Sequence, residues 1–404
     1  MNDTLSKSWF PINDLNPQNM ASGMIAGIFI ITGPSILILE AAANGGFTDF
    51  QTSLWMFSVY VFGGLFGIFL PLHYKIPIVG GHSLTGVAFL VTVTPQFTFH
   101  QLIGAYLISG VLMFLIGALG VFSKFIQLVP KEIISAMLAG MIMKYMVNFI
   151  ISTNQLWLIG SLSLITFFIF SKWKTRIPPV IAAIVVGFII MLVFYPMKIV
   201  DSSIGFLVPQ IQIPEFNVVS FLSVSIPLAL LILSNDAAVA IGGLQEKNYQ
   251  TPINKLISLS GIFTVITSFF GGQSANTAGM ATVICSGEEA GPKEKRYMGA
   301  VVAGVLLFIF GLCSWKLIPF IQALPKEFIA IIVGFSLIGV FGNSLYQSFS
   351  KESMKTSTAF AFIIAFSNIS IMSISAPVIS LLVGAFIARF VELNKAKITS
   401  KAEM

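Results

Sequence analysis

Apolar runs of membrane-spanning length, separated by short polar breaks, recur along almost the whole chain. A helix needs about 20 apolar residues to cross a lipid bilayer. The pattern predicts fourteen spans, at residues 20–40, 52–71, 76–93, 100–121, 131–150, 154–171, 178–197, 219–243, 252–270, 273–286, 297–316, 326–346, 355–370 and 372–391. The third and tenth are short and rich in Gly, Ser and Thr. The breaks are brief, so we expect no inserted soluble domain.

The composition supports an all-α polytopic membrane protein. Of the 404 residues, 56% are hydrophobic and 9% are charged, whereas soluble domains carry about 25% charged residues. A soluble domain, a collagen, a coiled coil, a disordered chain and a nucleic-acid binder are therefore excluded. Cys285 and Cys313 lie in apolar runs and indicate neither a disulfide framework nor a metal site. Residues 1–19 are polar and predict no secretory signal peptide.

The basic residues predict which side of the membrane each loop occupies. Cytoplasmic loops are enriched in Lys and Arg. With the N-terminus in the cytoplasm, 18 of the 22 basic residues fall on that side and three on the other, while Lys144 lies within the fifth span. A missed or invented span would degrade this split. We therefore expect a multi-pass protein of the cytoplasmic membrane with both termini inside. For Lys144 we favour a side chain that extends to the lipid headgroups.

An internal repeat divides the chain near its middle. Phe125-Ile-Gln-Leu-Val-Pro-Lys-Glu132 recurs as Phe320-Ile-Gln-Ala-Leu-Pro-Lys-Glu327, 195 residues later, with six of eight residues identical. Pro130 and Pro325 resemble first-turn prolines, and each glutamate would favour a helix N-terminus. The simpler alternative is two good helix starts. The motif Gly80-Gly-His-Ser83 similarly resembles Gly271-Gly-Gln-Ser274, and Glu40 aligns near Asp236.

Fourteen spans divided by two give seven per repeat, at residues 1–200 and 201–404. Seven is odd, so the second copy must enter the membrane from the opposite side. Such inverted repeats build many secondary transporters, and paired short, glycine-interrupted spans are the best sequence indication of a binding site at the membrane midplane. The third and tenth spans form that pair.

Both short spans are predicted to begin extended and to continue as half-helices. Pro77, Gly80 and Gly81 oppose a regular helix, and a half-helix is expected from near Ser83. Its counterpart is expected from near Ser274 or Asn276. Two helix N-termini would then present free N–H groups to an anionic or electron-rich ligand. We expect substrate contacts from His82, Ser83, Thr85, Asn235, Asp236, Gln273, Ser274, Asn276 and Thr277. The alternative is small-residue helix packing.

Two acidic residues, Glu40 and Asp236, lie toward the ends of the first and eighth spans. An ionisable group in a membrane is costly and by default indicates function. We expect Asp236, helped by Glu40 or His82, to gain and lose a proton during transport. Glu40 could instead face water in a short loop, Asp236 could be structural, and His82 could be a hydrogen-bonded interior histidine. No phosphate-binding loop, nucleophile elbow or Cys/His metal spacing is present, so we expect neither an enzyme nor a cofactor.

The stretch from Gly271 to Pro292, Gly-Gly-Gln-Ser-Ala-Asn-Thr-Ala-Gly-Met-Ala-Thr-Val-Ile-Cys-Ser-Gly-Glu-Glu-Ala-Gly-Pro, resembles the signature of the benzoate/proton symporter (BenE) family. Similar agreement occurs at Lys75-Ile-Pro-Ile and at Gly342-Asn-Ser-Leu-Tyr-Gln347. More distantly the chain resembles the uracil permease and SLC26-like anion-transporter fold. The chain departs from the BenE pattern at His82, Glu40, Asp236 and Gln273, which leaves the substrate open.

The resemblance implies a core domain of about 20–121 plus 219–316 and a gate domain of about 131–197 plus 326–391. It also implies a homodimer and elevator-like motion, with substrate held between spans three, eight and ten. The leading hypothesis is proton-coupled symport of a small aromatic carboxylate such as benzoate. A proton-coupled nucleobase (uracil or xanthine) permease, and an anion exchanger or channel on the same fold, remain as alternatives.

Overall fold

A computed structural model describes residues 12–32, 34–122, 130–173, 177–195, 208–371 and 374–392. Within these residues the first repeat contains α1 (Pro17–Thr32), α2 (Pro34–Asn44), α3 (Asp49–Tyr74), β1 (Gly80–Gly81), α4 (Leu84–Val93), α5 (Phe99–Ala118), α7 (Lys131–Gln155), α8 (Trp157–Lys172) and α9 (Pro179–Phe194). The first span is thus divided into α1 and α2, and Pro34 begins α2, where its missing N–H costs nothing.

The second repeat follows the same order of long helices and short interruptions. It contains α10 (Val218–Ser220), α11 (Ile226–Leu231), α12 (Ala238–Glu246), α13 (Ile253–Phe269), β2 (Asn276–Thr277), α14 (Gly279–Ser286), α15 (Tyr297–Gln322), α16 (Lys326–Ser348), α17 (Lys355–Ser367), β3 (Ser370–Ile371), β4 (Ile374–Ser375) and α18 (Ala376–Ile387). Two π-helical segments, Phe221–Ser225 and Ile232–Ala237, join α10, α11 and α12 into one long helix. A third, Ala388–Glu392, follows α18.

Helices occupy all fourteen predicted spans, which confirms the predicted all-α membrane fold. Among the residues that the structure describes, seven helical stretches are long and apolar enough to cross a membrane by themselves. The helices of the other predicted spans are shorter. The shortest of these are α4 and α14, which belong to the two broken spans. Residues 123–129, 174–176 and 196–207, and the chain ends at 1–11 and 393–404, lie outside the described residues. The predicted loop positions of Lys7, Lys124, Lys198 and Lys401 lie there too, as does most of the first copy of the repeated motif.

Local capping residues determine where several helices begin. Thr48 and Thr98 form capping boxes at the starts of α3 and α5, in which each threonine hydroxyl accepts the N–H of the third helical residue. Pro130 and Pro325 directly precede α7 and α16, one position earlier than the predicted first turn. A proline carries no N–H and fixes its own φ, so it fits both positions. Glu132 and Glu327 lie in the first turns, as predicted.

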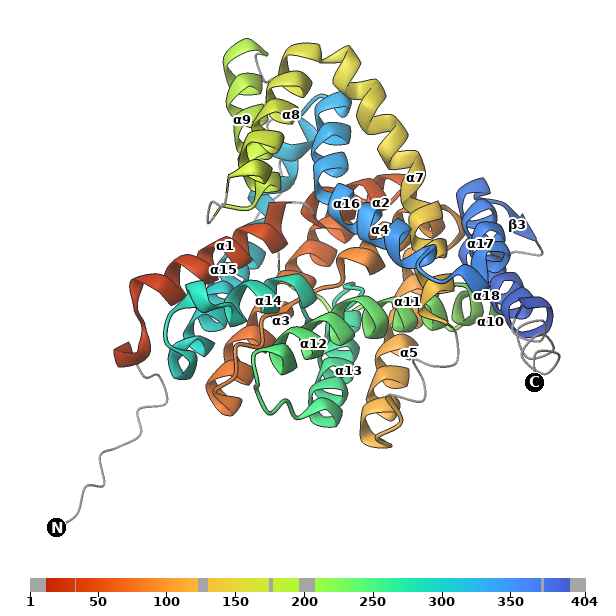
Figure 1. Cartoon of the computed structure of the whole chain (residues 1–404), viewed down its shortest axis with the longest axis horizontal. Helices are drawn as coiled ribbons and strands as arrows, with labels where there is room; N and C mark the ends of the chain where they lie inside the picture. The colour runs from red at the N-terminus through yellow and green to blue at the C-terminus, as the bar shows by residue number, and fades with distance from the viewer. Residues whose placement is uncertain are drawn as a thin grey trace, which may run out of the picture.

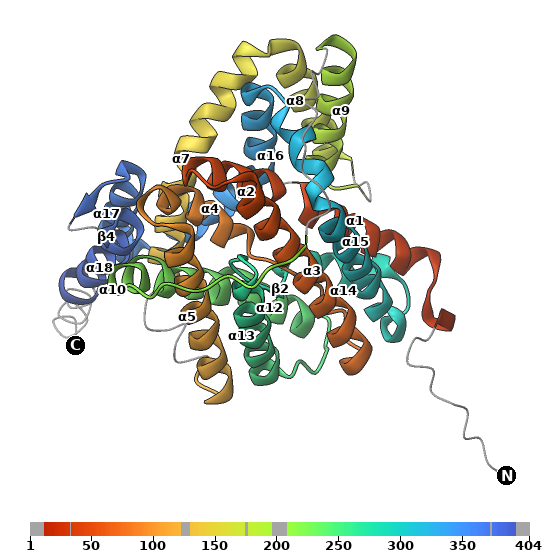
Figure 2. The ribbon, with the colours of Figure 1, turned by 180° about the vertical axis from the view of Figure 1, so that it is seen from behind.

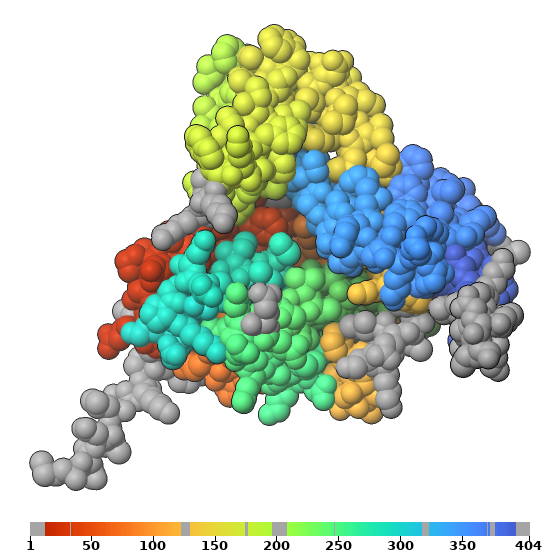
Figure 3. All heavy atoms as spheres, in the orientation of Figure 1, coloured from red at the N-terminus to blue at the C-terminus, as the bar shows by residue number. Residues whose placement is uncertain are grey.

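Helices that lie far apart in sequence pack side by side (Figures 1 and 2). α3 packs along α15, α15 also packs against α1, and α5 packs along α13. Elsewhere α7 packs along α16 and α17, and α17 packs against α18. In the space-filling view, α8 and α9, with the adjoining part of α7, form a lobe that projects from the rest of the molecule (Figure 3).

Glycines allow helices of the two repeats to approach each other closely. A Cβ added at Gly64 of α3 would lie 2.7 Å from the carbonyl oxygen of Gly304 in α15.

The extended residues 208–217 cross α5 and α13 (Figure 2). There the Gln212 N–H donates to the Phe269 carbonyl at 2.7 Å, and the Glu215 N–H donates to the His100 carbonyl at 3.0 Å. These contacts hold the segment before α10 against the packed helices.

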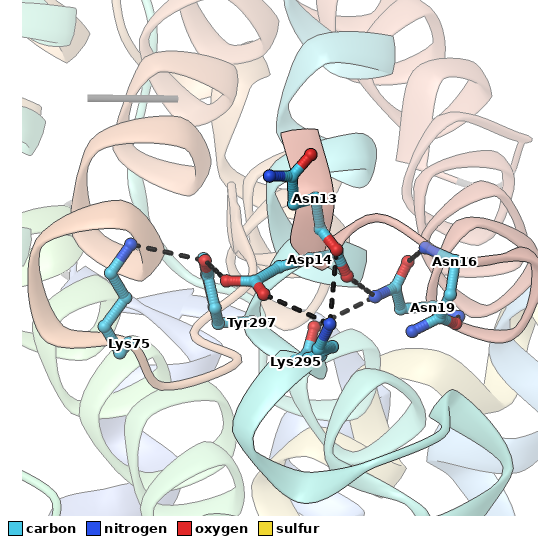
Figure 4. Close-up of polar contacts among 7 residues, drawn as sticks. All are labelled: Asn13, Asp14, Asn16, Asn19, Lys75, Lys295 and Tyr297. Carbon is cyan, nitrogen blue, oxygen red and sulfur yellow. Dashed lines mark hydrogen bonds and ion pairs between the residues drawn. The ribbon is translucent and has the colours of Figure 1, made fainter. Parts of the chain in front are cut away.

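A polar network fixes the segment before α1 (Figure 4). Asp14 accepts a hydrogen bond of 2.6 Å from the Tyr297 hydroxyl at the start of α15 and pairs with Lys295 at 3.4 Å. Lys75, at the end of α3, donates to the same Tyr297 hydroxyl at 3.3 Å. Buried Asn19 donates to the Lys295 carbonyl at 3.0 Å. The Tyr297 hydroxyl, and then Lys295, hold the pKa of Asp14 below its usual value.

Candidate binding site at the crossing of two broken spans

The two broken spans meet through a short antiparallel ladder. Gly80 of β1 pairs with Thr277 of β2, and Gly81 pairs with Asn276. The Ala278 N–H donates to the Val79 carbonyl at 2.8 Å, and the Val79 N–H donates to the hydroxyl of Thr282 at 3.1 Å. Backbone groups inside a membrane protein must be satisfied by partners in the protein. Each extended segment satisfies the other here, as the predicted pairing of interrupted spans requires.

The half-helix of the third span begins where it was predicted. Ser83 is its N-cap: the Ser83 hydroxyl accepts the Gly86 N–H at 2.9 Å, and α4 runs from Leu84. The predicted start of the tenth-span half-helix, near Ser274 or Asn276, was wrong. α14 begins at Gly279, because Asn276 and Thr277 adopt the extended conformation that pairs with β1.

The position of these helix starts also corrects the alignment of the repeats at the site. Ser83 and Ala278 precede the two half-helices and lie 195 positions apart, the offset of the repeated Phe125 and Phe320 motifs. The resemblance of Gly80-Gly-His-Ser83 to Gly271-Gly-Gln-Ser274 is therefore four residues out of register. Thr277, and not Gln273, is the positional counterpart of His82.

Ser83 joins the third span to the tenth by a hydrogen bond and lies beside the eighth. The Ser83 N–H donates to the Ser274 hydroxyl at 3.1 Å, and its own hydroxyl lies 3.2 Å from that of Thr85. The Ser83 side chain also interacts with the Asp236 carboxylate. Asp236 lies in the π-helical segment Ile232–Ala237, and π-turns inside helices are frequent at functional sites. The structure thus brings residues of three predicted spans together.

Six of the fifteen buried side-chain polar atoms without partners in the described residues belong to this crossing. These six are both ring nitrogens of His82, Oδ2 of Asp236, Nε2 of Gln273, Oδ1 of Asn276 and Oγ1 of Thr277. All five side chains are at least nine-tenths buried. A buried polar group without a hydrogen bond costs about 1–3 kcal/mol, and native proteins leave few of them. A ligand that donates and accepts hydrogen bonds would relieve this cost.

Asn235 differs from its neighbour Asp236. It is half-buried, and its Nδ2 donates to the Leu231 carbonyl at 3.3 Å and to the Ser234 hydroxyl at 3.1 Å, within its own helix. The carbonyl oxygens of Asn235 and Asp236 lie close to Gly279, at the start of α14, where an added Cβ would be 3.1 and 2.9 Å away. The small residue at 279 therefore allows α14 to contact this part of the eighth span.

Two aromatic residues of α3 support the site and have no counterpart in the predictions. The Trp55 Nε1–H donates to Gln273 Oε1 at 2.5 Å. The ring of Tyr60 meets His82 edge-on, with ring centroids 4.9 Å apart, and its hydroxyl lies 2.6 Å from the hydroxyl of Ser35. Both residues lie in a predominantly apolar span. Their polar atoms are the signal that could have singled them out, because a buried indole N–H or phenol needs a partner.

Glu40 lies apart from the crossing, at a cavity of about 610 Å³ between α2, the start of α3, α7 and α16. None of the nine predicted substrate-contact residues, all of them described, lines this cavity. Glu40 is half-buried within α2 and not in a loop, so the alternative of a loop position was wrong. Lys144 of α7 interacts electrostatically with it and is itself half-buried. Other lining residues are Phe47, Tyr145 and Lys326.

The sequence of the chain matches a known family over almost its whole length. Residues 13–390 match BenE, the family described as benzoate membrane transport protein. The chain belongs to the BenE family. The resemblance inferred from the Gly271–Pro292 stretch is thereby confirmed, and the BenE chain is a membrane transport protein. Within the residues that the structure describes, no group of three or more His, Cys, Asp and Glu residues could hold a metal ion.

Individual relatives agree with this assignment. The BenE chain is 28% identical over 370 residues to the inner membrane protein YdcO of Escherichia coli (strain K12), covering 91% of this chain and 94% of YdcO. It is 24% identical over 355 residues to the benzoate membrane transport protein of Acinetobacter baylyi (strain ATCC 33305 / BD413 / ADP1), covering 88% of this chain and 90% of the relative.

A solved structure confirms the fold. The transmembrane domain of the cyanobacterium bicarbonate transporter BicA superposes with a TM-score of 0.61 at 16% identity, covering 93% of this chain and 98% of that domain. Identity this low shows the fold alone. The predicted architecture of two inverted seven-span repeats, similar to anion transporters, is confirmed by this likeness together with the paired broken spans.

Proposed function

We propose that this BenE-family protein is a secondary active transporter that carries a small aromatic carboxylate such as benzoate together with a proton. The observation that carries the proposal is the group of unpartnered polar atoms at the crossing of β1 and β2. The helix N-terminus of α4 favours an anion, because its first N–H groups and its dipole present partial positive charge. Family membership and the relative named as a benzoate transport protein support the aromatic substrate.

Asp236 is the proposed proton carrier. It is buried beside Ser83, its Oδ2 has no partner, and it lies within the cluster that would hold the substrate. A proton taken up with a monoanion makes the transported unit neutral, so the membrane potential neither drives nor opposes it. We propose that His82 or Glu40 helps Asp236 to gain and lose this proton. Both ring nitrogens of His82 are unpartnered, and Glu40 lies at the cavity.

Transport requires one part of the protein to move against another. We propose a core domain of about 20–121 plus 219–316 and a gate domain of about 131–197 plus 326–391. The packing of α15 with α1 and α3, and of α7 with α16 and α17, supports this division. Elevator-like motion of the core, a homodimer, and a cytoplasmic-membrane location with both termini inside are parts of the same proposal, the last from the distribution of basic residues.

Uptake of radiolabelled benzoate into proteoliposomes tests the proposal. We expect accumulation when the outside is more acidic than the inside, and little effect of an imposed membrane potential. Asp236→Asn should bind benzoate but lose accumulation driven by the proton gradient. Glu352→Gln, which alters an exposed acid at the start of α17, is the matched control and should behave as the wild type. Uptake by Asp236→Asn with unchanged pH dependence would refute this mechanism.

Competition identifies the substrate class. Displacement of benzoate by other aromatic acids is expected, whereas displacement by uracil or xanthine would assign the site to nucleobases. Currents that reverse at the equilibrium potential of an anion and need no proton would instead identify an exchanger or channel.

A further inference from the structure

The amide of Gln273 has a fixed orientation. Its Oε1 accepts a hydrogen bond from Trp55 Nε1–H, while its Nε2 is buried and has no partner. The two amide ends of a glutamine are usually distinguished only through their hydrogen-bond partners. An indole N–H only donates, so its partner must be the carbonyl oxygen. The chemistry of Trp55 therefore assigns Oε1 to the indole and leaves the two N–H groups of Gln273 free.

Neighbouring residues hold both partners in place. The ring of Trp55 packs against those of Phe47 and Tyr106, with centroids 5.9 and 6.2 Å away. Gln273 follows two glycines that permit the chain to pass close to α3. Gly271 has φ +87°, and a Cβ on Gly272 would lie 2.5 Å from the hydroxyl of Ser58. Trp55 and Gln273 are both fully buried.

The free N–H groups of Gln273 belong to the crossing of the broken spans. The next residue, Ser274, accepts the N–H of Ser83, the N-cap of α4. A ligand at this crossing would thus meet a side-chain amide donor as well as the N-terminus of α4. Donors suit a carboxylate, whose oxygens only accept hydrogen bonds when ionised. An uncharged carboxamide of the same shape would turn its own N–H groups toward one of these donors.

We propose that Trp55 is a positioning residue for substrate specificity: by holding Oε1 of Gln273, it makes Gln273 a donor and makes the site prefer a carboxylate over the matching amide. This inference rests on the proposed function and adds the residue that sets the selectivity. Without the indole N–H, the Gln273 amide is free to rotate and to offer either a donor or an acceptor. The preference for carboxylate over amide is then lost.

Isothermal titration of purified protein with benzoate and benzamide tests the proposal. The readout is the dissociation constant of benzamide divided by that of benzoate, which is large when the site prefers the carboxylate. Trp55→Phe keeps the aromatic packing and removes the N–H, and its ratio should fall by about tenfold, the loss of one charge-assisted donor. Gln273→Met keeps the size of the side chain and should lower the ratio similarly. Matched controls are Trp157→Phe and Gln155→Met, exposed residues of α8 and α7 whose ratios should stay at the wild-type value.

The outcomes separate this inference from the proposed function. If the wild type prefers benzoate but Gln273→Met keeps the wild-type ratio, Gln273 is no donor to the substrate and the inference fails alone. If Gln273→Met lowers the ratio and Trp55→Phe does not, Trp55 has no positioning role. If Trp55→Phe does not fold, Gln273→Met and its control still decide the donor role. A wild type that binds neither compound overturns the proposed substrate and this inference together.

Discussion

Ser83 and Ser274 are joined by a hydrogen bond of 3.1 Å from the backbone N–H of Ser83 to the hydroxyl of Ser274. The same Ser83 caps α4 through its own hydroxyl, which accepts the Gly86 N–H. One residue therefore starts the half-helix of the third span and connects it to the segment that leads into β2. The N-terminus of α4 and the tenth span are fixed relative to each other at the proposed binding site.

Ser83→Ala should affect both folding and transport. Loss of the cap should lower the free energy of unfolding by about 1 kcal/mol, and benzoate uptake should fall because the Asp236 carboxylate loses the side chain beside it. Thermal unfolding in detergent and proteoliposome uptake measure the two effects. Thr98→Ala removes the capping hydroxyl of α5. This control should lose similar stability while its uptake per folded molecule stays normal. Equal loss of uptake in both variants would contradict the special role of Ser83.

Gly80→Ala should destabilise the crossing. A Cβ at Gly80 would lie 2.2 Å from the Gly63 carbonyl oxygen and 2.3 Å from the Gly67 nitrogen, both of them backbone atoms of α3. Overpacking of this kind costs about 1–3 kcal/mol, so the melting temperature should fall. Gly339→Ala in α16 meets nothing within 4 Å and should be neutral or slightly stabilising, since alanine favours helix. Equal melting temperatures for the two variants would show that β1 can move away from α3.

The sequence carried enough information for the spans and for the interruption of the third span. Apolar runs of about 20 residues and the distribution of Lys and Arg are properties of single segments, so they predict span number directly. Pro77, Gly80 and Gly81 interrupt the third span by local conformational preference, and Ser83 caps its half-helix. The half-helix was predicted to begin near Ser83, and α4 begins at Leu84.

The parts that failed depend on contacts between distant segments. The start of α14 at Gly279 follows from pairing of Asn276 and Thr277 with β1, which no local preference reveals. Trp55 and Tyr60 were missed because they lie in an apolar run. The hydropathy pattern of such a run is the same whether it faces lipid or a binding site. The two acids, Glu40 and Asp236, could be recognised as unusual from the sequence. The sequence does not show that Glu40 lies at the cavity whereas Asp236 lies at the crossing.

Asp14 should make stability depend on pH on the acidic side. The Tyr297 hydroxyl and Lys295 lower its pKa in the folded state. Its stabilising effect is therefore complete above the usual value of 3.8 and is lost as the pH falls through the lower folded-state pKa. Asp14→Asn should cost about 1–2 kcal/mol at neutral pH, since a hydrogen bond to a charged group is lost. The difference between wild type and variant should shrink in strong acid. Melting temperatures measured across this range check it, and a constant difference would contradict it.

Glu40 of α2 and Lys144 of α7 should stabilise the fold as a pair. Their charges attract each other, and both side chains are half-buried beside the cavity of about 610 Å³. Removal of one partner leaves the other charge uncompensated in a partly dehydrated place, which is unfavourable. We expect Glu40→Gln and Lys144→Met each to lower the melting temperature, and the double variant to lose less than their sum. A coupling free energy of about 0.5–1 kcal/mol is expected for such a pair.

The control combines Glu40→Gln with Lys316→Met, which alters an exposed lysine of α15. The losses of stability of these two variants should be additive. Additive losses for Glu40 and Lys144 would show instead that Lys144 extends to the headgroups, independently of Glu40.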